Sequence, residues 1–209
     1  MQIFKSIQTK FIFYFLAVAL IPLIIVGWLT FNQSHDFLLE QTSQELIGIR
    51  DLKAGELETF FNLVDEDVVL LSKLPMMAEA MQDFAETEDF YDVRMLGYLN
   101  HPDMIDSGNG TPYDTAHARY HPVFQEIVKF RDYSEVYLIN PKGFVVYNYD
   151  KGNDFATELI TGDYRDTHLA KLFHSLITIT DTNMVNFTDF VPYSPSGDIP
   201  SGFIGAKLM

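Results

Sequence analysis

The chain has 209 residues, enough for one globular domain and an anchor but too few for a further large module. Hydrophobic residues make up 47% and aromatic residues 14%, so a packed core is expected rather than disorder. The formal net charge of −15 argues against nucleic acid as a partner and suits a protein kept soluble in an external compartment. With no cysteine, disulfides, thiol nucleophiles and thiolate metal sites are excluded.

The first feature along the chain is an apolar segment, Phe11 to Phe31, which contains no charged residue. Its 21 residues span about 30 Å as a helix, the thickness of the hydrocarbon core of a bilayer. We therefore predict an uncleaved transmembrane helix in contact with membrane lipid. The alternative is a cleaved signal peptide, whose apolar stretch is shorter, roughly 7 to 15 residues, and ends in small residues. Here the segment ends in Trp28, Leu29, Thr30 and Phe31.

Charge placement predicts the orientation of this segment. Lys5 and Lys10 precede it, whereas Asp36, Glu40 and Glu45 follow it. The basic tail, residues 1–10, is expected in the cytoplasm and residues 32–209 outside, in an inner-membrane protein with one span. Without the two tail lysines, 12 basic residues remain against 29 acidic ones, and the outer part has a formal charge of −17.

Residues from Asn32 to about Leu74 contain no proline and predict one long helix. From Leu57 the apolar residues recur at intervals of four and three, through Phe61, Val64, Val68 and Leu71, which is the spacing of a helical stripe. Pro75 is expected to end or bend the helix. A shorter helix should follow, with one apolar face made by Met76, Met77, Ala80, Met81 and Phe84.

Residues 100–115 are rich in Asn, Asp, Gly, Pro and Ser and predict a loop. The next helix is expected to begin at His121-Pro122 and to end near Arg131. After this helix the spacing of the apolar residues changes to the period of strands. Residues 135–139 and 144–149, joined by Asn140-Pro141-Lys142-Gly143, predict a β-hairpin.

The last third predicts a turn-rich connection at 150–162, a short helix at 167–176 and two strands at 184–193 and 201–208. Four strands behind a long helix indicate an α+β domain with helices on one side of an antiparallel sheet. Since such a sheet needs every strand that covers its core, we expect a further strand beyond Met209.

Three segments together resemble the extracytoplasmic Cache sensor family. They are IRDLKAGELETFFNLVDEDVVLLSKLP (49–75), YHPVFQEIVKFRDYSEVYLINPKGFVVYNYDKGNDFATELITGDYRDTHLAKLF (120–173) and NFTDFVPYSPSGDIPSGFIGAKL (186–208). The order and spacing of these elements carry the resemblance, because each element alone is only moderately specific.

The resemblance implies a sensor domain between two membrane spans, with a long helix packed on a PAS-like antiparallel sheet and a ligand between the sheet and a loop layer. It implies the front part of a chemotaxis receptor of the methyl-accepting kind, or else of a sensor histidine kinase or nucleotide cyclase. The second span, HAMP linker and output module of that family are not among these 209 residues. The Tyr, Arg, Trp and Asp pattern of amino-acid-binding relatives is also absent, so no ligand residue is carried over from them.

The expected ligand is a small molecule, which needs an apolar concavity with a few fixed polar groups. Arg165 beside Asp166 could bind a carboxylate through its planar fork, with tyrosines as walls. The alternative is an ordinary loop salt bridge and core tyrosines. The candidate ligand-binding residues are Tyr137, Tyr147, Tyr149, Asp154, Tyr164, Arg165, Asp166, Asp189 and Tyr193.

The sequence gives less support to metal binding or catalysis. His117 and His121 have the spacing of zinc ligands on a helix, but Pro122 is expected to start a new helix and no third ligand is evident, so no metal or other cofactor is predicted. No catalytic motif is recognised, so the chain is not predicted to be an enzyme. The competing classes are an anchored periplasmic enzyme and a structural ectodomain. A homodimer formed through the long helix is expected.

Overall fold

The computed structural model describes residues 7–86 and 90–209, without the side chains at 32–33, 35–36, 38–39, 90–91 and 95–96. The chain divides into two units, Met1–Phe60 and Phe61–Met209. Lys5 and the side chain of Asp36, which contribute to the predicted orientation, lie outside the described part.

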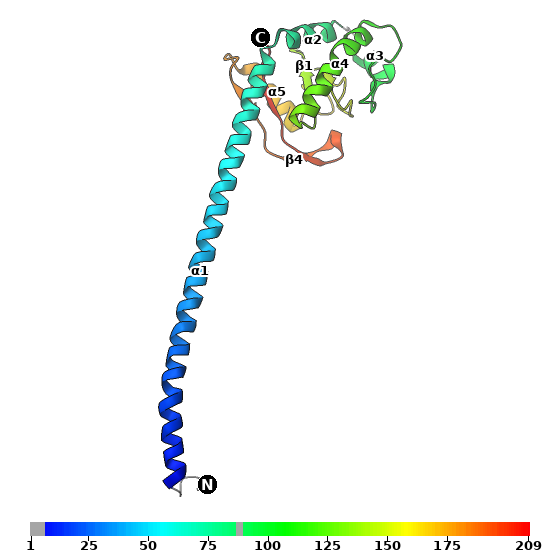
Figure 1. The fold of residues 1–209 in the computed structure, drawn as a ribbon. Helices are drawn as coiled ribbons and strands as arrows, with labels where there is room; N and C mark the ends of the chain where they lie inside the picture. The colour runs from blue at the N-terminus through cyan, green and yellow to red at the C-terminus, as the bar shows by residue number, and fades with distance from the viewer. Residues whose placement is uncertain (1–6, 87–89) are drawn as a thin grey trace. The chain divides into compact units, whose positions relative to one another are not determined.

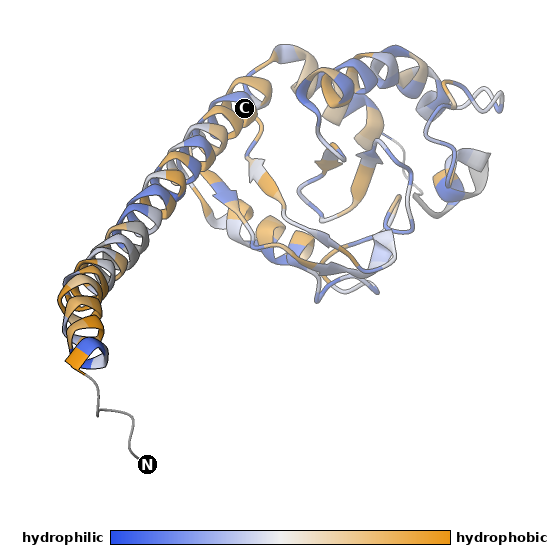
Figure 2. Cartoon of the chain, turned by 60° about the horizontal axis from the view of Figure 1, so that its bottom comes forward, coloured by the Kyte–Doolittle hydropathy of each residue, from blue (hydrophilic) through white to orange (hydrophobic). Residues whose placement is uncertain are grey.

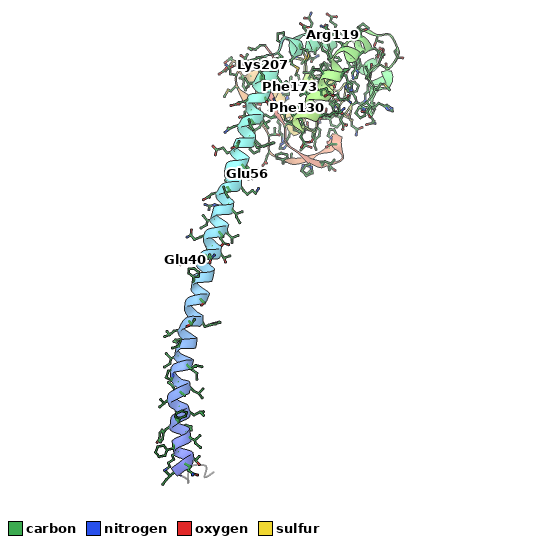
Figure 3. All side chains as sticks on the ribbon, viewed as in Figure 1. Glu40, Glu56, Arg119, Phe130, Phe173 and Lys207 are labelled. Atoms are coloured by element: carbon green, nitrogen blue, oxygen red, sulfur yellow. The ribbon has the colours of Figure 1, made fainter. Side chains whose placement is uncertain are left out.

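The first unit is the N-terminal part of helix α1 (Ile7–Ser72). Within it, Ile7–Phe31 has a length and composition that suit a membrane anchor or a signal sequence. Its large apolar side chains are exposed, and most of this end of the helix is coloured orange in Figure 2. Beyond it polar side chains appear, including Glu40 and Glu56, which point away from the helix axis (Figure 3). Pro22 lies inside α1, which continues to Ser72 and confirms the long helix.

The second unit confirms the predicted α+β class (Figure 1). Its helices after the end of α1 are α2 (Pro75–Ala85), α3 (Phe90–Val93), the π-helical turn η1 (Arg94–Tyr98), α4 (Pro112–Arg131), α5 (His168–Thr178) and the 3-10 turn η2 (Ser194–Ser196). Its strands are β1 (Tyr137–Ile139), β2 (Val145–Asn148), β3 (Val185–Phe187), β4 (Val191–Tyr193), β5 (Ile199–Ser201) and β6 (Ile204–Ala206).

Helix α2 begins where proline predicts it. Leu74 has an extended backbone with ψ 126°, and Pro75 occupies the first turn, where its missing N–H costs nothing. Met77, Ala80 and Phe84 are buried on one face, as the apolar spacing predicts. The face packs on α4, and Arg119 of α4, labelled in Figure 3, pairs with Glu79 and Asp83 of α2.

Helix α4 differs from the prediction, because it begins at Pro112 rather than at His121-Pro122. The hydroxyl of Thr111 accepts from the N–H of Asp114, and the Asp114 carboxylate accepts from the N–H of Thr111. This capping box starts the helix nine residues before His121, the predicted first residue. Pro122 is carried inside the helix, and the predicted loop at 100–115 therefore ends at Thr111.

The predicted hairpin is confirmed. β1 and β2 pair antiparallel, and the N–H of Gly143 donates to the carbonyl of Asn140 across the turn. Gly143 has φ +86°, a conformation that favours glycine. The Asn140 side chain also accepts from the N–H groups of Lys142 and Phe144. Side chain and glycine together close the turn.

The later strands are shorter than predicted and do not join one sheet with the hairpin. The segment 184–193 gives two strands, since β3 pairs with β6 whereas β4 pairs with β5. Between them Thr188 exchanges hydrogen bonds with the backbone of Phe203, and the chain then turns to β4. The described strands thus form three two-stranded ladders in place of one continuous sheet.

Two clusters of buried side chains form the interior of the second unit. The first joins α2, α4 and β2 through residues such as Phe84, Phe124 and Tyr147. The second joins α5 to β2 and β4 through Phe173, Val145 and Tyr193. Helix α5 forms where expected, with the Thr167 hydroxyl accepting from the N–H of Ala170 at its start. Strand β2 contributes to both clusters.

Candidate functional site

Strand β2 carries polar groups into the interior because of a β-bulge. Leu138 pairs with Tyr147, but Ile139 pairs with Val145, so Val146 is the extra residue. A bulge shifts the alternation of side chains by one position. As a result Val145 packs in the second cluster, whereas Val146 and Tyr147 both pack in the first. Asn148 follows, fully buried.

Asp154 is the centre of a buried hydrogen-bonded group, with 1% of its surface exposed. The hydroxyls of Tyr137 and Tyr193 donate to its Oδ2 at 3.0 and 2.6 Å. The amide nitrogen of Asn148 donates to its Oδ1 at 3.0 Å. These partners come from β1, β4 and β2, so three strands from two ladders meet at one carboxylate. We call Asp154, Asn148, Tyr137, Tyr193 and Phe203 the Asp154 cluster.

The turn-rich connection holds Asp154 in place. Ala156 donates its N–H to the carbonyl of Val145, and Val145 donates to the carbonyl of Thr157. The Thr157 hydroxyl and N–H both donate to the carbonyl of Asp154. Lys151 and Ala156 have positive φ, 52° and 55°, which lets the chain reverse between them. The position of the carboxylate is therefore set by backbone bonds to β2.

Aromatic rings enclose the cluster. Phe203 lies edge-on to the ring of Tyr193, with centroids 4.8 Å apart, and to that of Tyr137 at 6.0 Å. Tyr137 and Phe203 are only partly buried, whereas Asp154 itself is buried. The two tyrosine hydroxyls point at the carboxylate and Phe203 packs edge-on beside both rings, so aromatic carbon lies close to the charged group.

The cluster has more acceptors than donors. Within the described part of the chain, Asn148 Oδ1 is buried without a hydrogen-bond partner, and no lysine, arginine or histidine forms an ion pair with Asp154. Burial raises the pKa of Asp154 and outweighs the lowering by the hydroxyls of Tyr193 and Tyr137. A buried carboxylate without a cation is costly to keep ionised.

A second polar group lies in the first core cluster. Lys151 is fully buried, donates from Nζ to the carbonyl of Asn148 and lies 3.9 Å above the ring centre of Tyr147. Burial lowers its pKa to about 7, against the opposing effect of Glu135 and Asp150. The ammonium thus uses the π-face of Tyr147 rather than a carboxylate.

His117 and His121 complete this second group, and they do lie on one continuous helix, α4, contrary to the prediction. Their rings stack with centroids 4.5 Å apart. His117 Nδ1 donates to the carbonyl of Ile105, and His121 Nδ1 shares a hydrogen bond with the Tyr147 hydroxyl. Burial and the nearby Lys151 lower their pKa values, to about 2 for His117 and about 4 for His121. In the described residues no group of three metal-ligating side chains is formed.

The structure brings three of the predicted ligand-binding residues together: Tyr137, Asp154 and Tyr193. Tyr147 and Tyr149 belong to the other polar group, where both contact His121. Tyr164 packs at the edge of the second core cluster.

Arg165, Asp166 and Asp189 lie on the surface. Arg165 Nε is 3.6 Å from Asp166 Oδ2, and its Nη1 donates to the carbonyl of Gly162. Asp189 accepts from the N–H of Phe190. This geometry is that of the loop salt bridge considered as the alternative, and it gives the pair no part in the Asp154 cluster.

Asn148 and Phe203 are members of the cluster that sequence reasoning missed. Asn148 is a polar residue inside the apolar strand Val145-Val146-Tyr147-Asn148, and that contrast could have marked it. Phe203 offers no such indication, since it reaches the cluster through the pairing of β3 with β6 and of β4 with β5. The burial of Lys151 was also missed, because this residue lies in the turn-rich connection.

Comparisons of the chain with models of known protein families, with curated proteins and with solved structures give no match. The function of the site is therefore inferred from its residues and geometry.

Proposed function

We propose that the chain is the extracytoplasmic small-molecule-sensing part of a membrane-bound signal transducer, most consistent with a chemotaxis receptor of the methyl-accepting kind. The observation that carries the proposal is the Asp154 cluster. A buried carboxylate beside a buried unpaired amide oxygen destabilises a small domain unless a ligand contacts both. Strongly perturbed buried groups are concentrated at functional sites. The apolar helix before the domain supplies the membrane attachment.

The proposed topology places residues 32–209 outside the cytoplasm, in a protein held in the inner membrane by the span from Phe11 to Phe31. Lys10 precedes the span, whereas Glu40 and Glu45 follow it. Because the chain has no cysteine, a single Asp198→Cys substitution at an exposed turn provides a clean reporter. A membrane-impermeant maleimide should label it in intact spheroplasts. Labelling only after the membrane is permeabilised would contradict this topology.

A route from the cluster to α1 exists within the second unit. Asp67, in the last turns of α1, pairs with Arg131 at 2.8 Å and accepts from the Tyr133 hydroxyl at 3.2 Å. Tyr133 lies between the end of α4 and β1, the strand that carries Tyr137. A ligand that favours one position of β1 would therefore bias the end of α1, provided that its affinity differs between the two states.

We further propose that the chain forms a homodimer through the long helix and that the contact includes apolar surface between α1 and α4 in the second unit. A hollow of about 290 Å³ is lined by Leu70 and Leu71 of α1 and by Val123, Ile127 and Phe130 of α4. Phe130, labelled in Figure 3, is 82% exposed and Leu70 is 57% exposed. Exposed large apolar groups of this kind mark contact surfaces. Sedimentation of the detergent-solubilised chain should show a dimer that Phe130→Glu dissociates.

The sensing function is tested by a thermal-shift screen of the full chain in detergent against amines, amino acids, organic acids and purines. A ligand that binds only the folded domain raises the unfolding temperature, Tm. Near-UV circular dichroism of the tyrosines follows the second unit, where 10 of the 11 tyrosines lie. If no compound changes Tm while the domain is folded, the sensing function is wrong and a structural ectodomain is favoured.

A further inference from the structure

The Asp154 cluster contains unequal numbers of buried donors and acceptors. Three protein donors, from Tyr137, Tyr193 and Asn148, already contact the carboxylate. Asn148 Oδ1 then remains as a buried acceptor with no partner in the described residues. It belongs to the same side chain that donates to Asp154, so it lies next to the carboxylate. A group that fits here must bring N–H or O–H donors.

The charge around the cluster is negative. Asp150 lies close enough to raise the pKa of Asp154, and both Asp154 and Glu135 raise the pKa of Tyr137 beyond the effect of its burial. The positive charge nearest in sequence, Lys151, is directed at the ring of Tyr147 and the backbone carbonyl of Asn148, and it forms no ion pair with Asp154 among the described residues. An anionic ligand would be repelled at the Asp154 cluster, whereas a cation would neutralise it.

The enclosing rings restrict the kind of cation. Tyr137, Tyr193 and Phe203 bring aromatic carbon to the same place as the carboxylate. Calcium would require six to eight oxygen ligands, and magnesium would keep several waters. An alkylammonium group requires fewer polar contacts, and its carbon chain packs against aromatic rings.

We infer that the ligand of this domain is an organic cation with a primary ammonium group, which donates to Asp154 and to Asn148 Oδ1 and packs its carbon chain against Tyr137, Tyr193 and Phe203. This inference rests on the proposed sensing function and names the class of molecule that is sensed. One N–H bond to Asn148 Oδ1 satisfies the unpaired acceptor, and the positive charge compensates the buried carboxylate.

Three probes of similar size and different charge test the inference on the full chain in detergent: n-butylammonium, n-butanol and butyrate. Butylammonium should raise Tm, while the neutral alcohol and the anion should not. Potassium and calcium chlorides serve as further probes. An equal shift with either salt would assign the cluster to an inorganic cation and overturn the inference.

Variants then locate the binding site. Asp154→Asn keeps the shape of the side chain but removes its charge, and should weaken butylammonium binding at least about thirtyfold in calorimetry. Asn148→Ala removes the unpaired acceptor and should weaken it about tenfold. Asp166→Asn is the matched control, since this exposed carboxylate lies in the same connection and should leave affinity unchanged.

The outcomes separate this inference from the function on which it rests. If butyrate or butanol raises Tm and butylammonium does not, small-molecule sensing stands and the ammonium inference is wrong. If no compound in the wider screen binds, both fail. Loss of the near-UV signal in Asp154→Asn would mean that this variant does not fold. Asn148→Ala then tests the site in its place, and unchanged butylammonium affinity in that variant would overturn the inference.

Discussion

Asp114 and Asp154 are both buried in the second unit and both accept a hydrogen bond from a tyrosine hydroxyl, yet their pKa values move in opposite directions. Burial raises the pKa of each. At Asp114 the donors Ser107, Tyr98 and Thr111 outweigh burial and lower the pKa to about 2. At Asp154 burial outweighs Tyr193 and Tyr137, and the pKa is raised.

The difference lies in what surrounds each carboxylate. Asp114 occupies the first turn of α4, where a free backbone N–H and the positive end of the helix dipole favour negative charge. It accepts from Tyr98 and Ser107 at 2.5 Å and from the Thr111 N–H at 2.9 Å. Asp154 does not lie at a helix terminus, and Oδ1 of its neighbour Asn148 is a further buried acceptor. The fold therefore supplies the first aspartate with its hydrogen-bond donors, whereas the second lies beside an unpaired acceptor, on which the proposed ligand site rests.

The largest effect on stability is expected from Asp114→Ala. It removes the carboxylate half of the capping box and leaves the buried hydroxyl of Tyr98 without its acceptor, which together cost about 3 kcal/mol of unfolding free energy. Chemical denaturation followed by tyrosine near-UV circular dichroism measures the loss. Asp103→Ala, at an exposed position in the preceding loop, is the control. Equal stability of the two variants would show that Asp114 is not structural.

Asp154→Asn should instead increase the unfolding free energy. Removing a buried charge that has no cation, while keeping an oxygen for the tyrosines, should stabilise the protein without ligand by about 1 kcal/mol. The same denaturation measurement applies. A loss of stability comparable to that of Asp114→Ala would place both aspartates in the structural class and remove the distinction between them.

The pH dependence should differ between the two sites. The folded pKa of Asp114 is below the value of 3.8, so its stabilisation is present above pH 3.8 and is lost as pH falls towards 2. The folded pKa of Asp154 is above 3.8, so the native state binds more protons than the unfolded state and stability falls as pH rises from 3.8 through the folded pKa.

Comparing each variant with wild type separates the contribution of that aspartate to stability from those of the other titrating groups. Relative to wild type, Asp114→Asn should lose its destabilising effect as pH falls below 3.8, whereas the gain from Asp154→Asn should grow as pH rises above 3.8. Denaturation of the three proteins at a series of pH values measures both differences. Parallel curves for wild type and Asp154→Asn would contradict the raised pKa.

The smallest effect is expected at Arg165. Its side chain is half exposed and bonds only to its own loop in the described contacts, so Arg165→Ala should change stability by less than about 0.5 kcal/mol. Calorimetry should show unchanged butylammonium affinity in this variant. A tenfold loss would instead place the arginine at the ligand site, as the sequence alone suggested.

Local features made the helices and the hairpin predictable. Pro75, the apolar spacing from Leu57 and the turn Asn140 to Gly143 act over a few residues, and the structure agrees at each of them. The error at α4 was also local, since Thr111 and Asp114 form a capping box that a loop-like composition concealed. Pro122 does not break α4, because a helix loses only one backbone hydrogen bond at that position and packing of its other residues compensates.

By itself the sequence determined the apolar first segment, the α+β class and the existence of the hairpin, because each depends on the period or chemistry of neighbouring residues. Only the tertiary structure decided which residues surround Asp154. Its partners are 17, 6 and 39 residues away, and they converge through a β-bulge and the pairing of separate ladders. A one-residue shift in β2 reverses which side chains are buried on each face, so no local pattern could place Asn148 beside the carboxylate.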